Sequence, residues 1–324
     1  MTVAPRSAGD PGRTAARPFV DGTASALATL GIERRLFPFD GSWIELDAGR
    51  MHVVDEGDGP PVVLLHGNPT WSFFYRRLIS LLADRGFRAI APDHLGCGLS
   101  DRPARVDYPY SLQARVHDLD RLLAALGIDR AAFVVHDWGG MIGLSWIVDH
   151  LDRCDRVVAM NTAGFPLPES ARVPLALRLA RLPVIGSLLV RGLGLFERGA
   201  ARSCVTQALS GEVRRGYLAP YSSWRDRRAV HEFVLDIPLG ENHRSWQRVA
   251  ATARGLRGLD GGRLLVAWGG RDFVFDQHFL AGWKQRLPEA TYVEAPEAGH
   301  YLLEDAFDLV AAPIVSHLRG AAGR

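Results

Sequence analysis

FVVHDWGGMIG, residues 133–143, begins as a short apolar run typical of a buried strand and ends in small residues that can open a helix. One acidic residue, Asp137, stands at the junction. A sharp strand-to-helix turn around a single reactive residue is the arrangement of a nucleophile elbow, where Ser is the usual occupant. A carboxylate is already ionised at neutral pH, so it can attack a saturated or acyl carbon without first losing a proton. Asp137 is therefore a candidate nucleophile; the alternative is a helix-capping Asp.

Strand and helix signals alternate on both sides of this stretch. Further strands are predicted at 43–46, 51–54, 62–65, 88–91, 157–160, 264–268 and 291–293, and helices at 72–85, 111–126, 142–150, 276–286 and 306–318. This alternation predicts an α/β fold with a mostly parallel sheet and helices on both faces.

The alternation stops between residues 164 and 262. Arg- and Leu-rich helical stretches separated by Pro and Gly occupy this region, which predicts a helical cap over the carboxyl edge of the sheet. Its apolar residues either line a pocket or serve as ordinary packing, and packing is the expectation for most of them: Phe165, Leu167, Leu188, Leu189, Leu195, Phe196, Phe233 and Leu235.

The chain is thus expected to contain three parts. Residues 1–35 form an N-terminal extension that is expected to be disordered, 36–163 together with 263–324 form the core, and 164–262 form the cap. The first 17 residues are polar and rich in Gly, Pro, Ala and Arg, which predicts disorder and lacks the apolar segment of a signal peptide. Residues 23–35 could form a short helix.

Composition excludes several classes of protein. The 324 residues are 47% hydrophobic, enough for one large core plus a cap, and the net charge of +2 makes no case for nucleic acid binding. Three scattered cysteines are too few for a disulfide framework or a metal site, so a cytoplasmic location is expected. The most apolar long stretch, 182–196, is interrupted and shorter than the ~20 residues of a membrane span.

Three candidate catalytic residues follow three predicted strands. Asp137, Asp272 and His300 occur in the order nucleophile, acid, histidine, which is the chain order of α/β-hydrolases. His300 would activate water against a covalent intermediate, and Asp272 would hold the imidazole in the correct tautomer. Either residue alone is more simply explained as a hydrogen-bonded loop residue; the consistent order favours the catalytic interpretation.

Departing negative charge needs hydrogen-bond donors in such a site. The Asn68 side-chain amide and the Trp138 indole N–H are candidates, because neither carries a competing charge. The backbone N–H of Trp138 stands at the start of the predicted helix and adds the helix dipole. Ordinary packing is the alternative for Trp138.

Several motifs resemble the haloalkane dehalogenase family of α/β-hydrolases. They are HGNPT (66–70), DHLGCGLSD (93–101) and VHDWGG (135–140), and the resemblance covers nearly all of the chain after about residue 36. It implies an α/β-hydrolase fold with an inserted helical cap, Asp137 as nucleophile, and Asn68 and Trp138 as halide-binding residues. The residue that ends the earlier strand is Asn161 rather than a carboxylate, so the resemblance assigns the acid to Asp272.

Other segments are more similar to the olefin-biosynthesis β-lactone decarboxylases within that family. These segments are GCGLSD (96–101), NTAGFPLP (161–168), FVLDIPL (233–239) and AGHYLLED (298–305). The resemblance implies that cis-3,4-dialkyl-β-lactones are converted to cis-alkenes and carbon dioxide through a covalent Asp137 adduct. It implies a small apolar substrate, no metal or organic cofactor, and an upstream β-lactone synthetase as a partner.

Three alternatives stay open on the sequence. Haloalkane dehalogenation would use Asp137 to displace halide and His300 to direct water onto the ester. Epoxide hydrolysis would need cap tyrosines, for which Tyr217 and Tyr221 are candidates, but Asn68 departs from the aromatic residue expected there. A small-molecule receptor is the non-enzymatic alternative, and the intact set of three residues argues against it.

Overall fold

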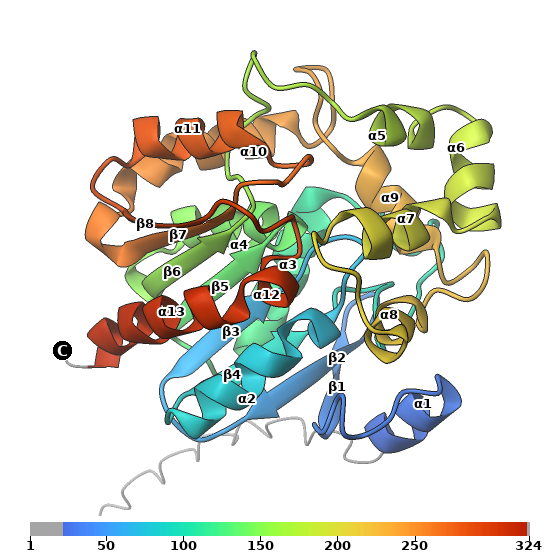
Figure 1. Ribbon diagram of the computed structural model, residues 1–324, viewed down its shortest axis with the longest axis horizontal. Coiled ribbons are helices and arrows are strands. Elements are labelled where there is room, and N and C mark those ends of the chain that lie inside the picture. Colours follow the sequence, from blue (N-terminus) through green and yellow to red (C-terminus); the bar gives the residue numbers. More distant parts are fainter. Residues whose placement is uncertain (1–21, 323–324) are drawn as a thin grey trace, which may run out of the picture.

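The sheet of the computed structural model, which describes residues 22–322, has eight strands in the order β1-β2-β4-β3-β5-β6-β7-β8 (Figure 1). The strands are β1 Gly41–Leu46, β2 Gly49–Glu56, β3 Pro61–Leu65, β4 Arg88–Pro92, β5 Ala131–His136, β6 Cys154–Met160, β7 Leu264–Gly269 and β8 Thr291–Ala295. Strand β2 pairs antiparallel with both β1 and β4, and the six strands from β4 to β8 pair in parallel. All eight predicted strands are confirmed, because their apolar runs were long enough to recognise.

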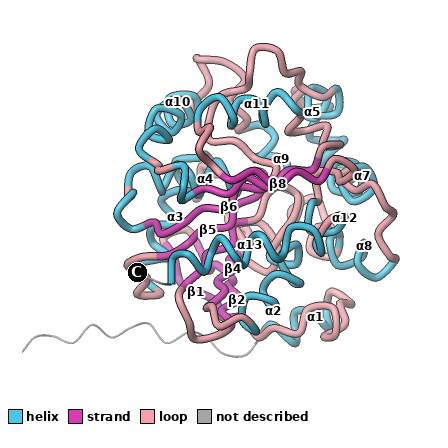
Figure 2. Tube along the Cα trace, turned by 60° about the vertical axis from the view of Figure 1, so that its left-hand side comes forward, coloured by secondary structure: helices cyan, strands magenta, loops and turns pink. Residues whose placement is uncertain are grey.

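Helices cover both faces of the sheet (Figure 2). Alternate strand residues point to two separate apolar clusters, so that Val63 and Phe133 pack with the α3–α4 side and Val62 and Val134 with the α2–α13 side. The core helices are η1 Ser72–Tyr75, α2 Arg76–Asp84, α3 Leu112–Ala125, α4 Trp138–Asp149, η2 Leu151–Arg153, η5 Gly261–Arg263, α11 Gln277–Arg286, α12 Leu302–Asp305 and α13 Phe307–Ala322.

Short helices connect β6 and β7, and those from α5 to α9 lie together beyond the carboxyl edge of the sheet, on the right of Figure 1, whereas α10 lies beside α11. They are α5 Leu175–Ala180, α6 Ile185–Ser187, the π-helix η3 Leu188–Gly192, α7 Leu195–Ser203, α8 Gly211–Leu218, α9 Arg228–Leu235, α10 Trp246–Gly255 and η4 Leu256–Gly258. Frequent Gly and Pro keep each helix short, and α10 turns back to pack against α4.

For residues 1–21 the predicted disorder of the N-terminal extension lies outside the described part, whereas residues 22–35 are folded. Helix α1, Thr23–Thr29, is present, with Leu27 fully buried and Ile32 nearly so. These two apolar side chains tie residues 22–35 to the α2 side of the sheet. Among the helices of residues 22–322, none combines the length and apolar character needed to cross a lipid bilayer.

Candidate active site

Asp137 stands alone on the turn between β5 and α4. Its backbone has φ 50° and ψ −122°, a conformation that non-glycine residues seldom adopt and that is typical of a strained functional turn. Its side chain does not cap α4. The carboxylate instead accepts a hydrogen bond at Oδ1 from the backbone N–H of Asn68, over 2.6 Å, while Thr162 Oγ1 donates to the Asp137 carbonyl. The structure therefore does not support the capping alternative.

Glycines make this sharp turn possible. A Cβ added to Gly67 would collide with the Asp137 side chain, and one added to Gly139 would collide with the carbonyl oxygen of Leu65. A Cβ on Gly140 would meet the Thr162 hydroxyl. The small residues that follow Asp137 in the sequence thus let α4 begin directly against the end of β3.

His300 and Asp272 complete a chain of polar contacts with Asp137. The His300 Nδ1–H donates to Asp272 Oδ2 over 2.7 Å, and His300 Nε2 faces Asp137 Oδ2 at 3.7 Å. Asp272 Oδ1 also accepts from the backbone N–H groups of Val274 and Phe275. Strand ends β5, β7 and β8 bring the three side chains together as the sequence order predicted, and all three are buried.

Burial and neighbouring groups shift the pKa values of Asp137 and His300. Burial raises the pKa of Asp137, although His300 and the backbone N–H groups of Asn68 and Trp138 act to lower it. Burial acts to lower the pKa of His300, but the Asp272 and Asp137 carboxylates outweigh it, so this pKa lies above its ordinary value. His300 is therefore a stronger base than a free histidine.

Asn161 is also part of the site. In the sequence it was notable only as a residue that is not a carboxylate, which left the role of the acid to Asp272. It follows β6 with φ 37°, which Asn tolerates better than most residues, and its Nδ2 donates to Asp272 Oδ2 over 2.9 Å. Its Oδ1 accepts from the backbone N–H of Gly269, and Nδ2 also reaches the Gly269 carbonyl. Asn161 therefore positions the carboxylate that orients His300.

Asn161→Leu is expected to reduce kcat by roughly 10- to 100-fold, the range seen when an orienting hydrogen-bond partner is removed. Loss of the amide removes one of the two side-chain hydrogen bonds to Asp272 Oδ2 and takes the Asn161 acceptor from the backbone N–H of Gly269. Steady-state kinetics would measure the loss, and the acid limb of the reaction that needs neutral His300 should move, because the carboxylate that raises the pKa of His300 is held less firmly. An unchanged kcat would show that backbone donors alone suffice to hold Asp272.

Asn68 and Trp138 both line the cavity above Asp137, but they differ in their hydrogen bonds. One N–H of the Asn68 side chain donates to the Val230 carbonyl of α9 over 3.1 Å, and Oδ1 is buried without a partner in the described structure. The second N–H of the amide is therefore the one available to a ligand. Trp138 is held by packing, with its ring 5.2 Å from that of Phe233.

A cavity of about 430 Å³ opens above these residues between the core and the cap. Its polar members sit at the floor, with Arg172 and Ser203 the exceptions from the cap. The remaining lining is largely apolar: Pro69, Met141, Phe165, Leu167, Val173, Pro174, Ala176, Leu177, Leu195, Phe196, Gly199, Ala200, Cys204, Val234, Ile237, Pro238, Leu239, Phe273, Val274, Phe275 and Phe279. Such a site suits an apolar ligand with one polar reacting centre.

Half of the cap residues considered for the pocket line it. Phe165, Leu167, Leu195 and Phe196 do so, whereas Leu188, Leu189, Phe233 and Leu235 are absent from the lining. The sequence contained no signal for this division, because it depends on how short helices turn relative to one another.

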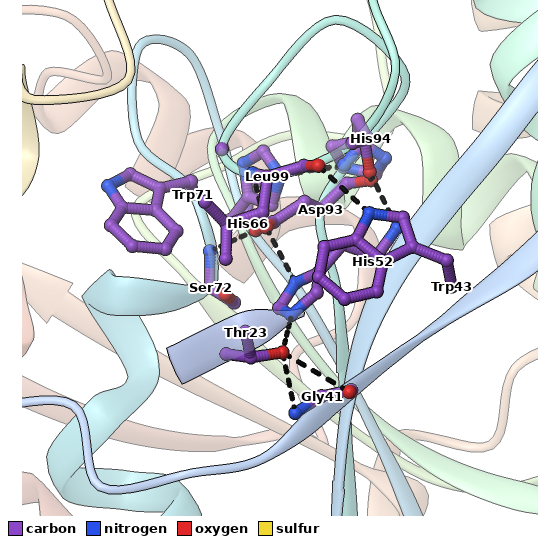
Figure 3. A network of polar contacts seen from close by, with 12 residues as sticks. Thr23, Gly41, Trp43, His52, His66, Trp71, Ser72, Asp93, His94 and Leu99 are labelled. Atoms are coloured by element: carbon purple, nitrogen blue, oxygen red, sulfur yellow. Dashed lines mark hydrogen bonds and ion pairs between the residues drawn. The ribbon is translucent and has the colours of Figure 1, made fainter. Parts of the chain in front are cut away.

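A buried polar network supports the loops beneath the site (Figure 3). His52 lies between Thr23 and Asp93, with 3.0 Å from His52 Nδ1 to Asp93 Oδ2. Asp93 also accepts from the backbone N–H groups of Ser72 and Leu99. These contacts fasten the segment after β4 to the loop that follows β3, which carries Asn68. The sequence reasoning missed Asp93, although an acidic residue directly after an apolar strand was a visible signal.

His66 and His136, which lie in the motifs HGNPT and VHDWGG, have structural roles. His66 donates from Nδ1 to the Gly67 carbonyl and accepts at Nε2 from the backbone N–H of His94. His136 Nε2 donates to the carbonyl of His300. Burial lowers the pKa of both imidazoles, so they are neutral at pH 7 and hold the loops as hydrogen-bonding groups.

The fold and this site define the class of the protein. Residues 60–307 match the model of the family described as alpha/beta hydrolase fold, and the chain belongs to that family. Solved haloalkane dehalogenases share the architecture: DbeA from Bradyrhizobium elkani superposes with a TM-score of 0.79 at 24% identity, over 88% of this chain and 99% of that one. At this identity the likeness concerns the fold alone.

Comparison of amino-acid sequences identifies relatives with higher identity than these structures. A cis-3-alkyl-4-alkyloxetan-2-one decarboxylase of Shewanella oneidensis is 41% identical over 88% of both chains. The Xanthomonas campestris protein of the same name is 42% identical, over 83% of this chain and 92% of its own. Haloalkane dehalogenase 2 of Mycobacterium tuberculosis is 35% identical over 87% of this chain and 96% of its own. These relatives are enzymes, and both groups named from the sequence motifs are among them.

Proposed function

We propose that the protein is a β-lactone decarboxylase that converts cis-3,4-dialkyl-β-lactones to cis-alkenes and carbon dioxide. The observation that carries the proposal is an Asp137 carboxylate facing His300 at the floor of an apolar cavity, in a chain 41–42% identical to two enzymes named for this reaction. Two alkyl chains would occupy the apolar walls, and the lactone ring would lie against Asp137, Asn68 and Trp138.

The chemistry begins with attack of Asp137 Oδ2 on the saturated, alkyl-substituted ring carbon that is bonded to the ring oxygen. The carbon–oxygen bond breaks and its electron pair remains on the released substrate carboxylate, which the second N–H of Asn68 and the indole N–H of Trp138 would stabilise from the cavity lining. This direction is favoured over attack at the carbonyl, because carboxylate is a far better leaving group at pH 7 than alkoxide.

Loss of carbon dioxide completes the reaction. The bond between the carboxylate carbon and its neighbour breaks, its electron pair forms the carbon–carbon double bond, and the ester bond to Asp137 breaks to return the free carboxylate. No water is consumed and no proton is gained or lost. His300 then acts as an orienting, positively polarised neighbour of Asp137, held by Asp272.

Haloalkane dehalogenation is the second candidate, favoured by the 35% identical relative of that name. Asp137 would displace halide from carbon, and His300 would remove a proton from water that attacks the resulting ester. The same residues serve both reactions, but only this one requires water and a basic His300.

Epoxide hydrolysis fits the site less well. It needs a tyrosine hydroxyl to protonate the opening ring, yet none of the seven tyrosines, all within the described residues, lines the cavity. Tyr217 donates to Glu304, and Tyr221 donates to the Thr70 carbonyl over 3.1 Å. Both hydroxyl groups are engaged in joining the cap to the core.

A paired assay tests the proposal. One arm supplies purified protein with a long-chain cis-β-lactone and detects the alkene by gas chromatography–mass spectrometry. The other supplies a 1-bromoalkane of similar length and measures bromide release. We expect rapid alkene formation with little bromide. Bromide release without alkene would overturn the proposal in favour of the dehalogenase.

The pH dependence of the two activities should differ. Asp137 must be ionised in both, and because its pKa is raised, both activities fall as the pH drops through that value. Hydrolysis also needs neutral His300, whose pKa the Asp272 and Asp137 carboxylates raise above that of an ordinary histidine despite burial, so bromide turnover should already fail at a higher pH than alkene formation. Profiles of kcat against pH for both substrates would check this, and coincident acid limbs would contradict a water-free route.

The proposal extends to the setting of the enzyme. It includes a cytoplasmic location, supported by three cysteines that are free and buried, and an upstream β-lactone synthetase that supplies the substrate. It also takes residues 164–262 as the cap that confers chain-length selectivity, with 36–163 and 263–324 as the catalytic core.

A further inference from the structure

Large apolar side chains are exposed mainly on one part of the cap. Of the thirteen in the described residues, eight fall between residues 175 and 195. We call the segment 175–195, which spans α5, α6, η3 and the start of α7, the cap ridge. Val184 is 73% exposed, Leu175 66% and Leu193 58%. Soluble proteins rarely expose so many neighbouring apolar side chains to water unless the surface binds something.

The cap ridge borders the mouth of the cavity. Leu195, which belongs to it, is half exposed and also lines the cavity, as do the exposed Leu239 and Phe273. Helices α5, α6 and α7 adjoin one another in Figure 1, and η3 contacts both α6 and α7. The exposed apolar surface is therefore continuous with the apolar interior of the site.

Positive charge is concentrated in the same segment of the chain. Between residues 172 and 202 the sequence contains six arginines and one glutamate, so this segment carries +5 while the whole chain carries +2. The glutamate, Glu197, is buried and paired with Arg227, whereas Arg178, Arg198 and Arg202 are exposed. Trp224 lies beside the ridge, with the Arg191 guanidinium 4.4 Å from its ring centroid.

We propose that the cap ridge docks onto an anionic lipid bilayer and turns the mouth of the cavity toward the acyl region. Exposed aliphatic side chains interspersed with exposed arginines, and with a tryptophan next to them, are the pattern of surfaces that lie in a membrane interface. A negatively charged leaflet complements the +5 segment, with each basic residue near the surface contributing about 1 kcal/mol. A protein partner would leave the continuity with the cavity unexplained.

Docking would supply an apolar substrate directly from the bilayer. Only this consequence rests on the proposed function, because lipid binding by the ridge can be measured without any substrate. An apolar lactone with two alkyl chains would enter past Leu195 without crossing water.

Vesicle co-sedimentation tests the proposal with the full-length protein. Vesicles of phosphatidylcholine with phosphatidylglycerol are compared with vesicles of phosphatidylcholine alone. One variant combines Val184→Ser, Ile185→Ser and Leu188→Ser; a second combines Arg178→Gln, Arg198→Gln and Arg202→Gln. None of these six residues lines the cavity. Matched controls are Leu309→Ser, an exposed leucine on α13, and Arg254→Gln with Arg257→Gln, exposed arginines on and after α10.

We expect wild-type protein to sediment with the anionic vesicles and each ridge variant to bind roughly tenfold more weakly or worse, while the controls bind normally. The contribution of the arginines should shrink at high salt. Thermal melting checks that all variants are folded, and turnover of a short, water-soluble substrate should be unchanged in them.

Wild-type protein that stays in the supernatant, or controls that lose as much binding as the ridge variants, would overturn the proposal. So would ridge variants that bind vesicles normally but dissociate a larger assembly, since the ridge would then contact protein. Vesicle binding without turnover of any lactone would refute the proposed function alone.

Discussion

Asp137→Asn is expected to abolish alkene formation, with kcat falling about 10⁴-fold or more, the scale on which the loss of a nucleophile acts. The amide has nearly the shape of the carboxylate, but it is neutral and cannot form the covalent adduct. Its oxygen can still accept the hydrogen bond from the Asn68 N–H, so the elbow should keep its geometry. The variant should fold at least as stably as wild type, because burial already disfavours the charged carboxylate at this position.

The measurement is alkene yield at equal concentrations of folded protein, with thermal melting as the check on folding. Asp118→Asn is the matched control, because Asp118 is also buried and hydrogen-bonded, to Tyr108, but lies on α3 outside the site. Burial raises the pKa of Asp118 to about 6, so this control also removes a carboxyl that resists ionisation. Activity lost in both variants would point to a general effect of buried charge, and substantial activity in Asp137→Asn would exclude Asp137 as nucleophile.

The core of the fold could be predicted because its signals are local. Each strand of the parallel sheet is a short apolar run, and the alternation of such runs with amphipathic helices leaves few topologies. The positions of Asp137, Asp272 and His300 followed from the same reasoning, since residues after neighbouring parallel strands meet at one edge. The break in alternation after residue 163 indicated, in the same way, a stretch of helices without strands, which the structure has between β6 and β7.

Other features depend on contacts between distant residues and left no local signal. The bond from Asn161 to Asp272 joins residues 111 positions apart, and that from Asn68 to Val230 spans 162. The helices of the cap are too short for periodicity to indicate which side faces inward. Val184 is exposed and Val190, six residues later, is buried, and this difference is therefore set by tertiary packing.

His300→Gln should separate the two candidate chemistries most sharply. Glutamine fills much of the imidazole's space but cannot act as a base, so an alkyl ester on Asp137 formed from a 1-bromoalkane should no longer be hydrolysed. Intact-mass spectrometry should then show the protein heavier by one alkyl group less one proton. The β-lactone should leave no such adduct, because its ester can break down by losing carbon dioxide without water.

The alkene arm of the same experiment measures how far His300 supports Asp137 electrostatically. Removing the imidazole, which faces Asp137 Oδ2 at 3.7 Å, takes away a group that lowers the pKa of the nucleophile. We therefore expect slower but measurable alkene formation, with its acid limb shifted to higher pH. Phe275, stacked at 5.9 Å on the His300 ring, offers the control variant Phe275→Leu, which perturbs the packing but keeps the base and should accumulate no ester. An adduct that accumulates from the lactone as well would mean that breakdown of the Asp137 ester needs His300 in both reactions, and the water-free route would be wrong.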